Sequence, residues 1–234
     1  MKLNVEIFAD GADINGMLEM NNKPFISGFT TNPTLMRKAG IDNYKEFAIK
    51  ILSKIKDKPI SFEVFSDDFD EMERQAKEIT TWGKNVFVKI PITNTKGESS
   101  KSLVEKLSNE GVKLNVTAMF TLEQVKRILP ALKNSPGANI SIFAGRIADA
   151  GIDPLPIMKE TVQELEPYNN IKLIWASPRE LYNVVQANEI GCHIITVTNN
   201  ILNKLPTLGK DLTEFSLETV KMFYNDALNA GYSL

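Results

Sequence analysis

A lysine interrupts an otherwise apolar run of the sequence, VFVKIPI at residues 86–92. Desolvation within such a run disfavours the charged ammonium of Lys89, and a neutral amine can attack a carbonyl carbon to form a Schiff base. A structural explanation is equally open, because a lysine in an apolar strand can pair with a carboxylate or extend its ammonium to water. The residue type and its setting make Lys89 a candidate nucleophile.

Two carboxylates occupy comparable positions in earlier apolar runs. Glu63 stands within SFEVF, where it could pair with Lys89 or act as an acid or base through a water molecule. The alternative for Glu63 is a purely structural ion pair. Asp10 ends the run VEIFAD, and a lone aspartate at such a point is more often a turn or cap residue than a catalyst.

Polar side chains recur at two-residue spacing in later runs. Asn115 and Thr117 lie in LNVTAMF, and this spacing places both side chains on one face of a strand. An asparagine in an apolar strand needs hydrogen-bond partners, and a carbonyl-derived substrate could supply one. Ser141 and Phe143 repeat the spacing in NISIFAG, and Arg146 follows them.

Ser177 and Arg179 follow the run KLIWAS, where a helix is expected to begin at Pro178 and to close at Gly191. Backbone N–H groups and the helix dipole favour an anion at such a point, and the adjacent arginine suggests phosphate. The alternative is that Ser177 caps this helix, with Glu180 completing a capping box.

These residues are distributed over a regular series of β-rich apolar runs, which begin roughly 20–30 residues apart as in βα units. The runs are VEIFAD (5–10), SGFTTN (27–32), ISFEVFS (60–66), VFVKIPI (86–92), LNVTAMF (114–120), NISIFAG (139–145), KLIWAS (172–177) and HIITVT (193–198). The pattern predicts a single (β/α)8 barrel domain over residues 1–234, with a doubly wound open sheet as the competing fold. No G-x-G-x-x-G or P-loop follows any run, which argues against nucleotide-binding versions of that sheet.

Helical patterns separate the runs. Residues 67–82 carry an apolar stripe, and a capping box of Thr121 and Gln124 starts a helix that Pro130 is expected to kink or end early. Gly111 is expected just past the end of another helix, and residues 213–231 form the last one. Because a barrel gathers its chemistry at the carboxyl ends of its strands, we expect the polar residues above to meet there.

Composition restricts the class of protein. The formal net charge is −2 with scattered basic residues, which argues against a nucleic-acid partner. Cys192 and His193 are the sole cysteine and histidine, so an internal disulfide is excluded and a His/Cys metal site is disfavoured, although carboxylates could still bind Mg²⁺. We interpret both residues as packing or strand-end residues. Without a signal-peptide core or an apolar stretch of about 18 residues, a cytoplasmic protein with no membrane span is expected.

Seven ordered motifs along the chain resemble the transaldolase family, a group of class I aldolase-type (β/α)8 enzymes. They are FADGAD (8–13), GFTTNPTL (28–35), FEV (62–64), VKIP (88–91), LNVTAMF (114–120), SIFAGRI (141–147) and ASPR (176–179). The resemblance implies a transaldolase that moves a dihydroxyacetone unit from sedoheptulose 7-phosphate or fructose 6-phosphate to an aldose phosphate. It implies no metal and no cofactor, and it places the reaction in the pentose phosphate pathway.

The resemblance also implies a role for each site residue. Lys89 would form the Schiff base, Asp10 would exchange the proton of the hydroxyl at the broken bond, and Glu63 would shuttle protons through a water held by Thr117. The substrate-binding set implied by the family is Thr31, Asn32, Asn115, Ser141 and Phe143 for the sugar, with Arg146, Ser177 and Arg179 for the phosphate.

Alternatives to a transaldolase stay open. A related branch of the family cleaves fructose 6-phosphate as an aldolase and carries Gln in place of Glu63 and Tyr in place of Phe143, so this sequence sides with the transaldolases. The other readings are action on another sugar, a sugar-phosphate-binding barrel without turnover, and a barrel isomerase with Glu63 as base and Lys89 as electrophile. The resemblance further implies homo-oligomers, pentamers or decamers, that assemble through the terminal helix.

Overall fold

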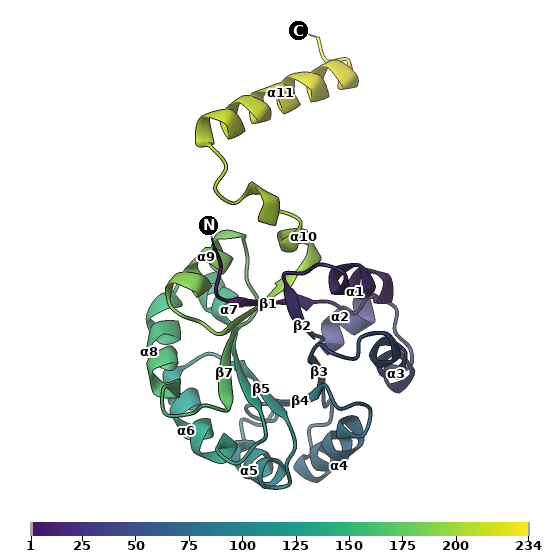
Figure 1. The fold of residues 1–234 in the computed structure, drawn as a ribbon, viewed down its shortest axis with the longest axis vertical. Helices are drawn as coiled ribbons and strands as arrows, with labels where there is room; N and C mark the ends of the chain where they lie inside the picture. The colour runs from purple at the N-terminus through teal and green to yellow at the C-terminus, as the bar shows by residue number, and fades with distance from the viewer. Residues whose placement is uncertain (1, 234) are drawn as a thin grey trace.

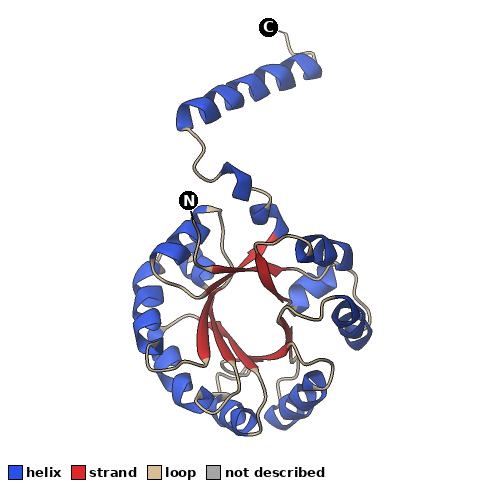
Figure 2. Cartoon of the chain, in the orientation of Figure 1, coloured by secondary structure: helices blue, strands red, loops and turns tan. Residues whose placement is uncertain are grey.

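Eight parallel strands form the centre of the protein in the computed structural model, which describes residues 2–233. Each strand pairs with the next and β8 pairs with β1, so the sheet closes into a barrel (Figure 1, Figure 2). The predicted (β/α)8 barrel is confirmed, and the open sheet is excluded. The strands are β1 (Glu6–Asp10), β2 (Ile26–Thr30), β3 (Ile60–Glu63), β4 (Val86–Pro91), β5 (Leu114–Met119), β6 (Ala138–Ile142), β7 (Ile171–Trp175) and β8 (Ile194–Thr198).

Helices cover the outside of the barrel and alternate with the strands along the chain (Figure 2). They are α1 (Ile14–Asn21), α2 (Pro33–Lys38), α3 (Tyr44–Lys54), α4 (Phe69–Thr80), α5 (Lys101–Asn109), α6 (Leu122–Leu132), α7 (Ala144–Asp149), α8 (Leu155–Leu165), α9 (Tyr182–Glu189), α10 (Asn199–Leu202), the 3₁₀ turn η1 (Leu205–Thr207) and α11 (Leu212–Ala230). The apolar faces of the helices and the outward faces of the strands form the main core, in which residues such as Val88, Val116 and Ile140 are fully buried.

The inside of the barrel holds a second, much smaller apolar cluster of Phe8, Ile174 and Ile194. Gly28 gives the Phe8 ring its space, because a Cβ atom there would lie 2.5 Å from the ring. Successive side chains of a strand point to opposite faces, so Asp10 lies on the same face of β1 as Phe8, one layer closer to the carboxyl end. Asp10 therefore lies above this apolar cluster.

Most predicted helix features are confirmed, and two are wrong. Residues 67–82 contain α4 with its buried apolar stripe, and α6 begins with the capping box of Thr121 and Gln124. Pro130 lies inside α6, and the helix ends two residues later at Leu132.

The helix expected from Pro178 begins only at Tyr182. The Asn183 side chain accepts the N–H groups of Arg179 and Glu180, at 2.7 and 3.1 Å, and holds these residues in a separate turn. Ser177 therefore caps no helix, and the proposed capping box with Glu180 is wrong. In the described chain, no helix therefore begins directly after Ser177 to favour an anion there with its dipole and free N–H groups.

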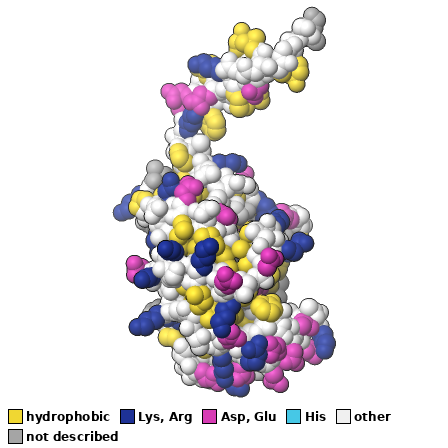
Figure 3. Space-filling view, turned by 90° about the vertical axis from the view of Figure 1, so that its right-hand side faces the viewer, with side chains coloured by type: hydrophobic (Ala, Val, Ile, Leu, Met, Phe, Trp, Pro, Cys, Tyr) yellow, Lys and Arg dark blue, Asp and Glu magenta, His cyan; other side chains and the backbone are white. Residues whose placement is uncertain are grey.

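The terminal helix α11 projects away from the barrel (Figure 1). None of its residues is buried, although it carries large apolar side chains such as Val220, Phe223 and Leu228. Figure 3 shows apolar side chains on the surface of the projecting helix, on more than one side of it. In the part of the chain that the structure describes, no helix combines the length and the apolar character that a membrane crossing requires.

Candidate active site

A cavity of about 490 Å³ opens at the carboxyl ends of the strands, where the barrel fold predicts a site. Its wall combines residues that are far apart in the sequence, because every strand ends at the same rim. The predicted residues on this wall are Asp10, Asn32, Glu63, Lys89, Thr117, Ser141, Phe143, Arg146, Ser177 and Arg179. Thr31 and Asn115 are not on it.

Lys89 is buried, with 5% of its surface exposed, and its ammonium group has two partners. Nζ lies 3.1 Å from Oε2 of Glu63 and donates a hydrogen bond of 2.9 Å to the carbonyl oxygen of Thr31. The pair forms because β3 and β4 are neighbours in the barrel with Glu63 directly opposite Lys89. Lys89 is thus paired with a carboxylate and also forms part of the cavity wall, so the ion pair does not exclude a catalytic role.

Asp10 completes a cluster of three ionisable groups. Its Oδ1 accepts a hydrogen bond of 2.7 Å from the hydroxyl of Thr30, which also contacts the hydroxyl of Thr196. Burial raises the pKa of Asp10, while Lys89 and the Thr30 hydroxyl oppose the rise and the charge of Glu63 adds to it. Asp10 therefore holds its proton to higher pH than an ordinary aspartate, which suits a group that must both accept and return a proton.

Asn115 lies beneath the cavity wall, fully buried, and organises its neighbours. Its amide donates to the hydroxyl of Ser61 at 3.1 Å, and its carbonyl oxygen accepts from the hydroxyl of Ser141 at 2.7 Å. Ser141 reaches the cavity itself. The hydroxyl of Thr117, also on the wall, is buried without a hydrogen-bond partner among the described residues, so it is available to a ligand.

Thr31 and Asn32 connect β2 to α2 and use their side chains differently. The hydroxyl of Thr31 donates to the carbonyl of Ser61 at 2.8 Å and is fully buried, so Thr31 offers the site a main-chain oxygen for Lys89. Asn32 lines the cavity, and its side-chain oxygen accepts the N–H of Leu35 at 2.9 Å as the cap of α2. This hydrogen bond fixes the orientation of the Asn32 side chain, including its amide nitrogen.

The opposite side of the cavity is basic. The guanidinium of Arg179 contacts both carboxylate oxygens of Asp149 at 2.5–3.1 Å, and its Nη1 donates to the carbonyl and hydroxyl oxygens of Ser177 at 2.9 Å. The hydrogen bonds between Arg179 and Asp149 lower the pKa of Asp149 and raise the pKa of Arg179. The guanidinium of Arg146 lies 5.5 Å from the ring centre of Phe143. Two arginines and a serine thus face one end of the cavity.

A close backbone approach fixes Ser177. A Cβ atom on Gly145 would lie 1.6 Å from the carbonyl oxygen of Ser177, so only glycine allows α7 to reach this loop. Ser177 itself adopts a left-handed backbone conformation, with φ of 61°. Asp149 and Gly145 were not identified from the sequence, because their importance depends on α7 packing beside the end of β7.

Cys192 and His193 lie just before β8, at the end of the strand opposite the cavity. Cys192 is buried, and burial raises the pKa of its thiol to about 12. His193 accepts the N–H of Leu173 through Nδ1 at 3.2 Å. Both act in packing, as expected. Within residues 2–233, no three His, Cys, Asp or Glu side chains form a group that could hold a metal ion.

The chain is similar to proteins of a known family over nearly its whole length. The family described as "Transaldolase/Fructose-6-phosphate aldolase" matches residues 7–233. A "Probable transaldolase" of Thermoanaerobacter sp. (strain X514) is 37% identical over 219 residues, which are 93% of this chain and 95% of that protein. A "Probable transaldolase" of Dehalococcoides mccartyi is 35% identical over 202 residues, 86% of this chain and 90% of that protein.

A solved structure with a similar fold is that of 2,3-dimethylmalate lyase, described as a member of the PEP mutase/isocitrate lyase superfamily. Its TM-score is 0.56 and its sequence identity 11%, and the match covers 99% of this chain and 85% of that one. At this identity the likeness concerns the barrel fold alone.

Proposed function

Because the chain belongs to the transaldolase/fructose-6-phosphate aldolase family, we propose that it is a transaldolase that works through a Schiff base on Lys89. The donor is a ketose phosphate, sedoheptulose 7-phosphate or fructose 6-phosphate, and the acceptor is an aldose phosphate. The observation that carries this proposal is the buried Lys89–Glu63 pair beside Asp10 on the wall of one cavity.

Imine formation needs an uncharged lysine next to a proton carrier. Glu63, at 3.1 Å, accepts a proton from the Lys89 ammonium, and the free amine then bonds to the keto carbon of the donor. Glu63 gives the proton to the hydroxyl of the carbinolamine, which leaves as water. The unpartnered hydroxyl of Thr117 is suited to hold that water at the cavity wall.

The protonated imine draws electrons from the adjacent carbon–carbon bond. Asp10 removes the proton from the C4 hydroxyl, the C3–C4 bond breaks, and its electron pair enters the imine to give an enamine while an aldose phosphate leaves. The enamine carbon then attacks the aldehyde of the acceptor, Asp10 returns its proton to the new hydroxyl, and water hydrolyses the imine. The raised pKa of Asp10 makes it a stronger base for the first of these steps.

Substrate recognition divides between the two ends of the cavity. Asn32 and Ser141 line the cavity and would bind hydroxyls of the dihydroxyacetone unit, and the hydrogen bond between Asn115 and Ser141 supports this role. The basic end, with Arg146, Ser177 and Arg179, is suited to the phosphate. The two ends face one continuous cavity, which a phosphorylated sugar can span.

An aldolase of the related branch is the second candidate. It would release free dihydroxyacetone, which requires protonation of the enamine carbon instead of attack on an acceptor. Phe143 presents a ring without a hydroxyl to the cavity and packs against Phe120 at 5.9 Å, so this wall supplies no phenolic proton donor. This favours transfer over release.

The test supplies fructose 6-phosphate with and without erythrose 4-phosphate. A transaldolase forms sedoheptulose 7-phosphate and glyceraldehyde 3-phosphate when both sugars are present, and it accumulates little free dihydroxyacetone without the acceptor. Rapid release of dihydroxyacetone in the absence of an acceptor would assign the aldolase instead.

We also propose that copies of the chain assemble through α11, as pentamers or decamers. The helix exposes apolar side chains over its length and contributes none to the core of its own barrel, so a second copy of this chain is the occupant we expect. Replacing Val220 and Phe223 with aspartate should reduce the particle mass measured by light scattering. An unchanged mass would contradict this role of α11.

A further inference from the structure

The hydrogen bonding of β3 changes partner at Glu63, the residue that pairs with Lys89. β2 and β3 pair only at Phe29↔Ile60 and Thr30↔Ser61, and the last bond of this ladder runs from the N–H of Thr31 to the carbonyl of Ser61. In a parallel ladder the next bond would run from the N–H of Glu63 to the carbonyl of Thr31. That carbonyl instead accepts Nζ of Lys89 at 2.9 Å.

The hydroxyl of Tyr44 takes the place that β2 leaves open. It accepts the N–H of Glu63 at 2.7 Å and donates to the carbonyl of Glu63 at 2.9 Å. One hydroxyl can do both only while it is protonated. Burial raises the pKa of Tyr44 well above its ordinary value, so the proton is retained throughout the range in which enzymes work.

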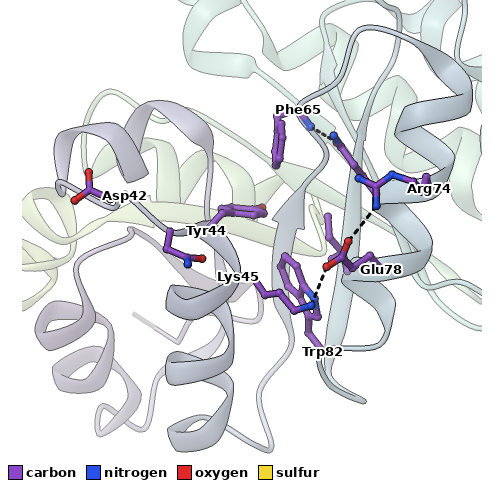
Figure 4. A pocket seen from close by; sticks show the side chains of 10 residues that line it. Asp42, Tyr44, Lys45, Phe65, Arg74, Glu78 and Trp82 are labelled. Carbon is purple, nitrogen blue, oxygen red and sulfur yellow. Dashed lines mark hydrogen bonds and ion pairs between the residues drawn. The ribbon is translucent and has the colours of Figure 1, made fainter.

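The ring of Tyr44 is fixed from several sides. Tyr44 is the first residue of α3, whose cap Asn43 accepts the N–H of Glu46 at 3.0 Å. Its ring makes edge-to-face contacts with Phe65 and Trp82, at 5.7 and 5.5 Å between ring centres. Figure 4 shows Tyr44 extending from α3 toward Phe65 and the neighbouring strand.

From this geometry we propose that Tyr44 is a positioning residue for the reaction: its hydroxyl holds the backbone of Glu63 and thereby leaves the Thr31 carbonyl free to bind Lys89. Both acceptors of the Lys89 ammonium depend on it. Oε2 of Glu63 is held 3.1 Å from Nζ of Lys89. The carbonyl oxygen of Thr31 makes no hydrogen bond to β3 and accepts one from Nζ of Lys89. The inference rests on the proposed function for its catalytic consequence, and on the hydrogen bonds alone for its structural part.

The variant Tyr44→Phe removes the hydroxyl and keeps the ring. We expect the rate of imine formation, followed by borohydride trapping at saturating fructose 6-phosphate, to fall about tenfold, the effect of roughly one lost buried hydrogen bond. KM should stay within about twofold, because Tyr44 does not line the cavity. Tyr182→Phe is the matched control, since it removes the hydroxyl of an exposed tyrosine at the start of α9, away from the cavity wall, and should leave the rate within about twofold.

A double-variant cycle shows whether Tyr44 acts through Glu63. If it does, Tyr44→Phe should slow the reaction of the Glu63→Gln enzyme by less than about twofold, because the group that it positions is already lost. Independent, multiplying effects would contradict the proposal, and so would a Tyr44→Phe enzyme with the rate of the wild type.

Amide hydrogen exchange tests the structural part without any substrate. Tyr44→Phe should speed exchange of the Glu63 N–H about tenfold or more, while the amides of β4 keep their protection. If the wild type forms no adduct with sugar, the proposed function fails and the exchange result still decides the role of Tyr44. An unchanged exchange rate at Glu63 would overturn that role.

Discussion

The two ends of the cavity hold their charges in different ways. At one end Lys89 and Glu63 are largely buried, with 7% and 17% of their side chains exposed, and strand register sets their distance. At the other end Arg179 and Asp149 are 42% and 54% exposed and come from the segments that follow β7 and β6. Under the proposed function, the buried end supplies the fixed distances that the reaction needs, and the exposed end receives a phosphate that must enter and leave.

This contrast predicts that substitutions at the buried end act on the chemical steps, while those at the exposed end act on binding. The difference follows from screening, because exposed ion pairs are weakened by water and salt and buried pairs much less so. The effects should also differ greatly in size.

The largest effect is expected for Lys89→Met. Turnover should fall by about 10⁴ or more, because the covalent route is lost, while the circular dichroism spectrum stays that of a folded barrel. Lys38→Met is the matched control, since Lys38 is the other lysine on the cavity wall and should keep activity within about tenfold. Substantial activity in Lys89→Met would refute the Schiff base.

Asp10→Asn should lower kcat by about 10²–10⁴, since proton transfer at the broken bond is lost. The same change should stabilise the protein. Because burial raises the pKa of Asp10 above its ordinary 3.8, the folded state binds this proton more tightly, and stability from the group is lost as pH rises through the folded pKa.

At pH 7 the Asp10→Asn protein should therefore melt at a higher temperature than the wild type. The difference should disappear below pH 3.8, where the wild-type carboxyl is protonated in both states. Calorimetry over a pH series makes the comparison, and a lower melting temperature of the variant at pH 7 would contradict the buried carboxylate.

Arg179→Ala belongs to the exposed end and should act on KM. We expect KM for phosphorylated donors to rise about 10- to 100-fold, the range for a lost charge-assisted hydrogen bond, with a small effect on dihydroxyacetone as donor. Added salt should weaken phosphate binding of the wild type more than of the variant. Equal effects on both donors would remove Arg179 from the phosphate site.

Gly145→Ala should produce the smallest effect of this series. The new Cβ would meet the Ser177 carbonyl and push its loop outward, which should raise KM for phosphorylated donors about tenfold with kcat largely kept. Gly137→Ala is the control, because its Cβ would find ordinary contacts at 3.6 Å or more. A Gly145→Ala enzyme with unchanged KM would show that the close approach of Gly145 to Ser177 does not position the residues proposed to bind phosphate.

The sequence predicted the buried end better than the exposed one. Strand alternation and the order of the runs were enough to place Asp10, Glu63 and Lys89 on one rim, because register in a closed barrel leaves little freedom. Strand spacing also singled out Asn115, but only the structure shows that it lies below the wall and supports Ser141.

Features that depend on helices and loops were not predictable in the same way. The sequence predicted that α9 begins at Pro178, but it begins at Tyr182. The side chain of Asn183 accepts two N–H groups of the preceding turn, a contact that local sequence patterns do not reveal. Tyr44 was missed for a related reason. It lies at the start of an outer helix. Its hydroxyl can reach Glu63 because β2 stops pairing with β3 before that residue.

Borohydride trapping followed by mass spectrometry tests the central claim most directly. Wild-type protein incubated with fructose 6-phosphate and then reduced should carry one dihydroxyacetone-derived adduct, and peptide mapping should locate it on Lys89. The absence of an adduct, or an adduct on Lys38 in place of Lys89, would contradict the account.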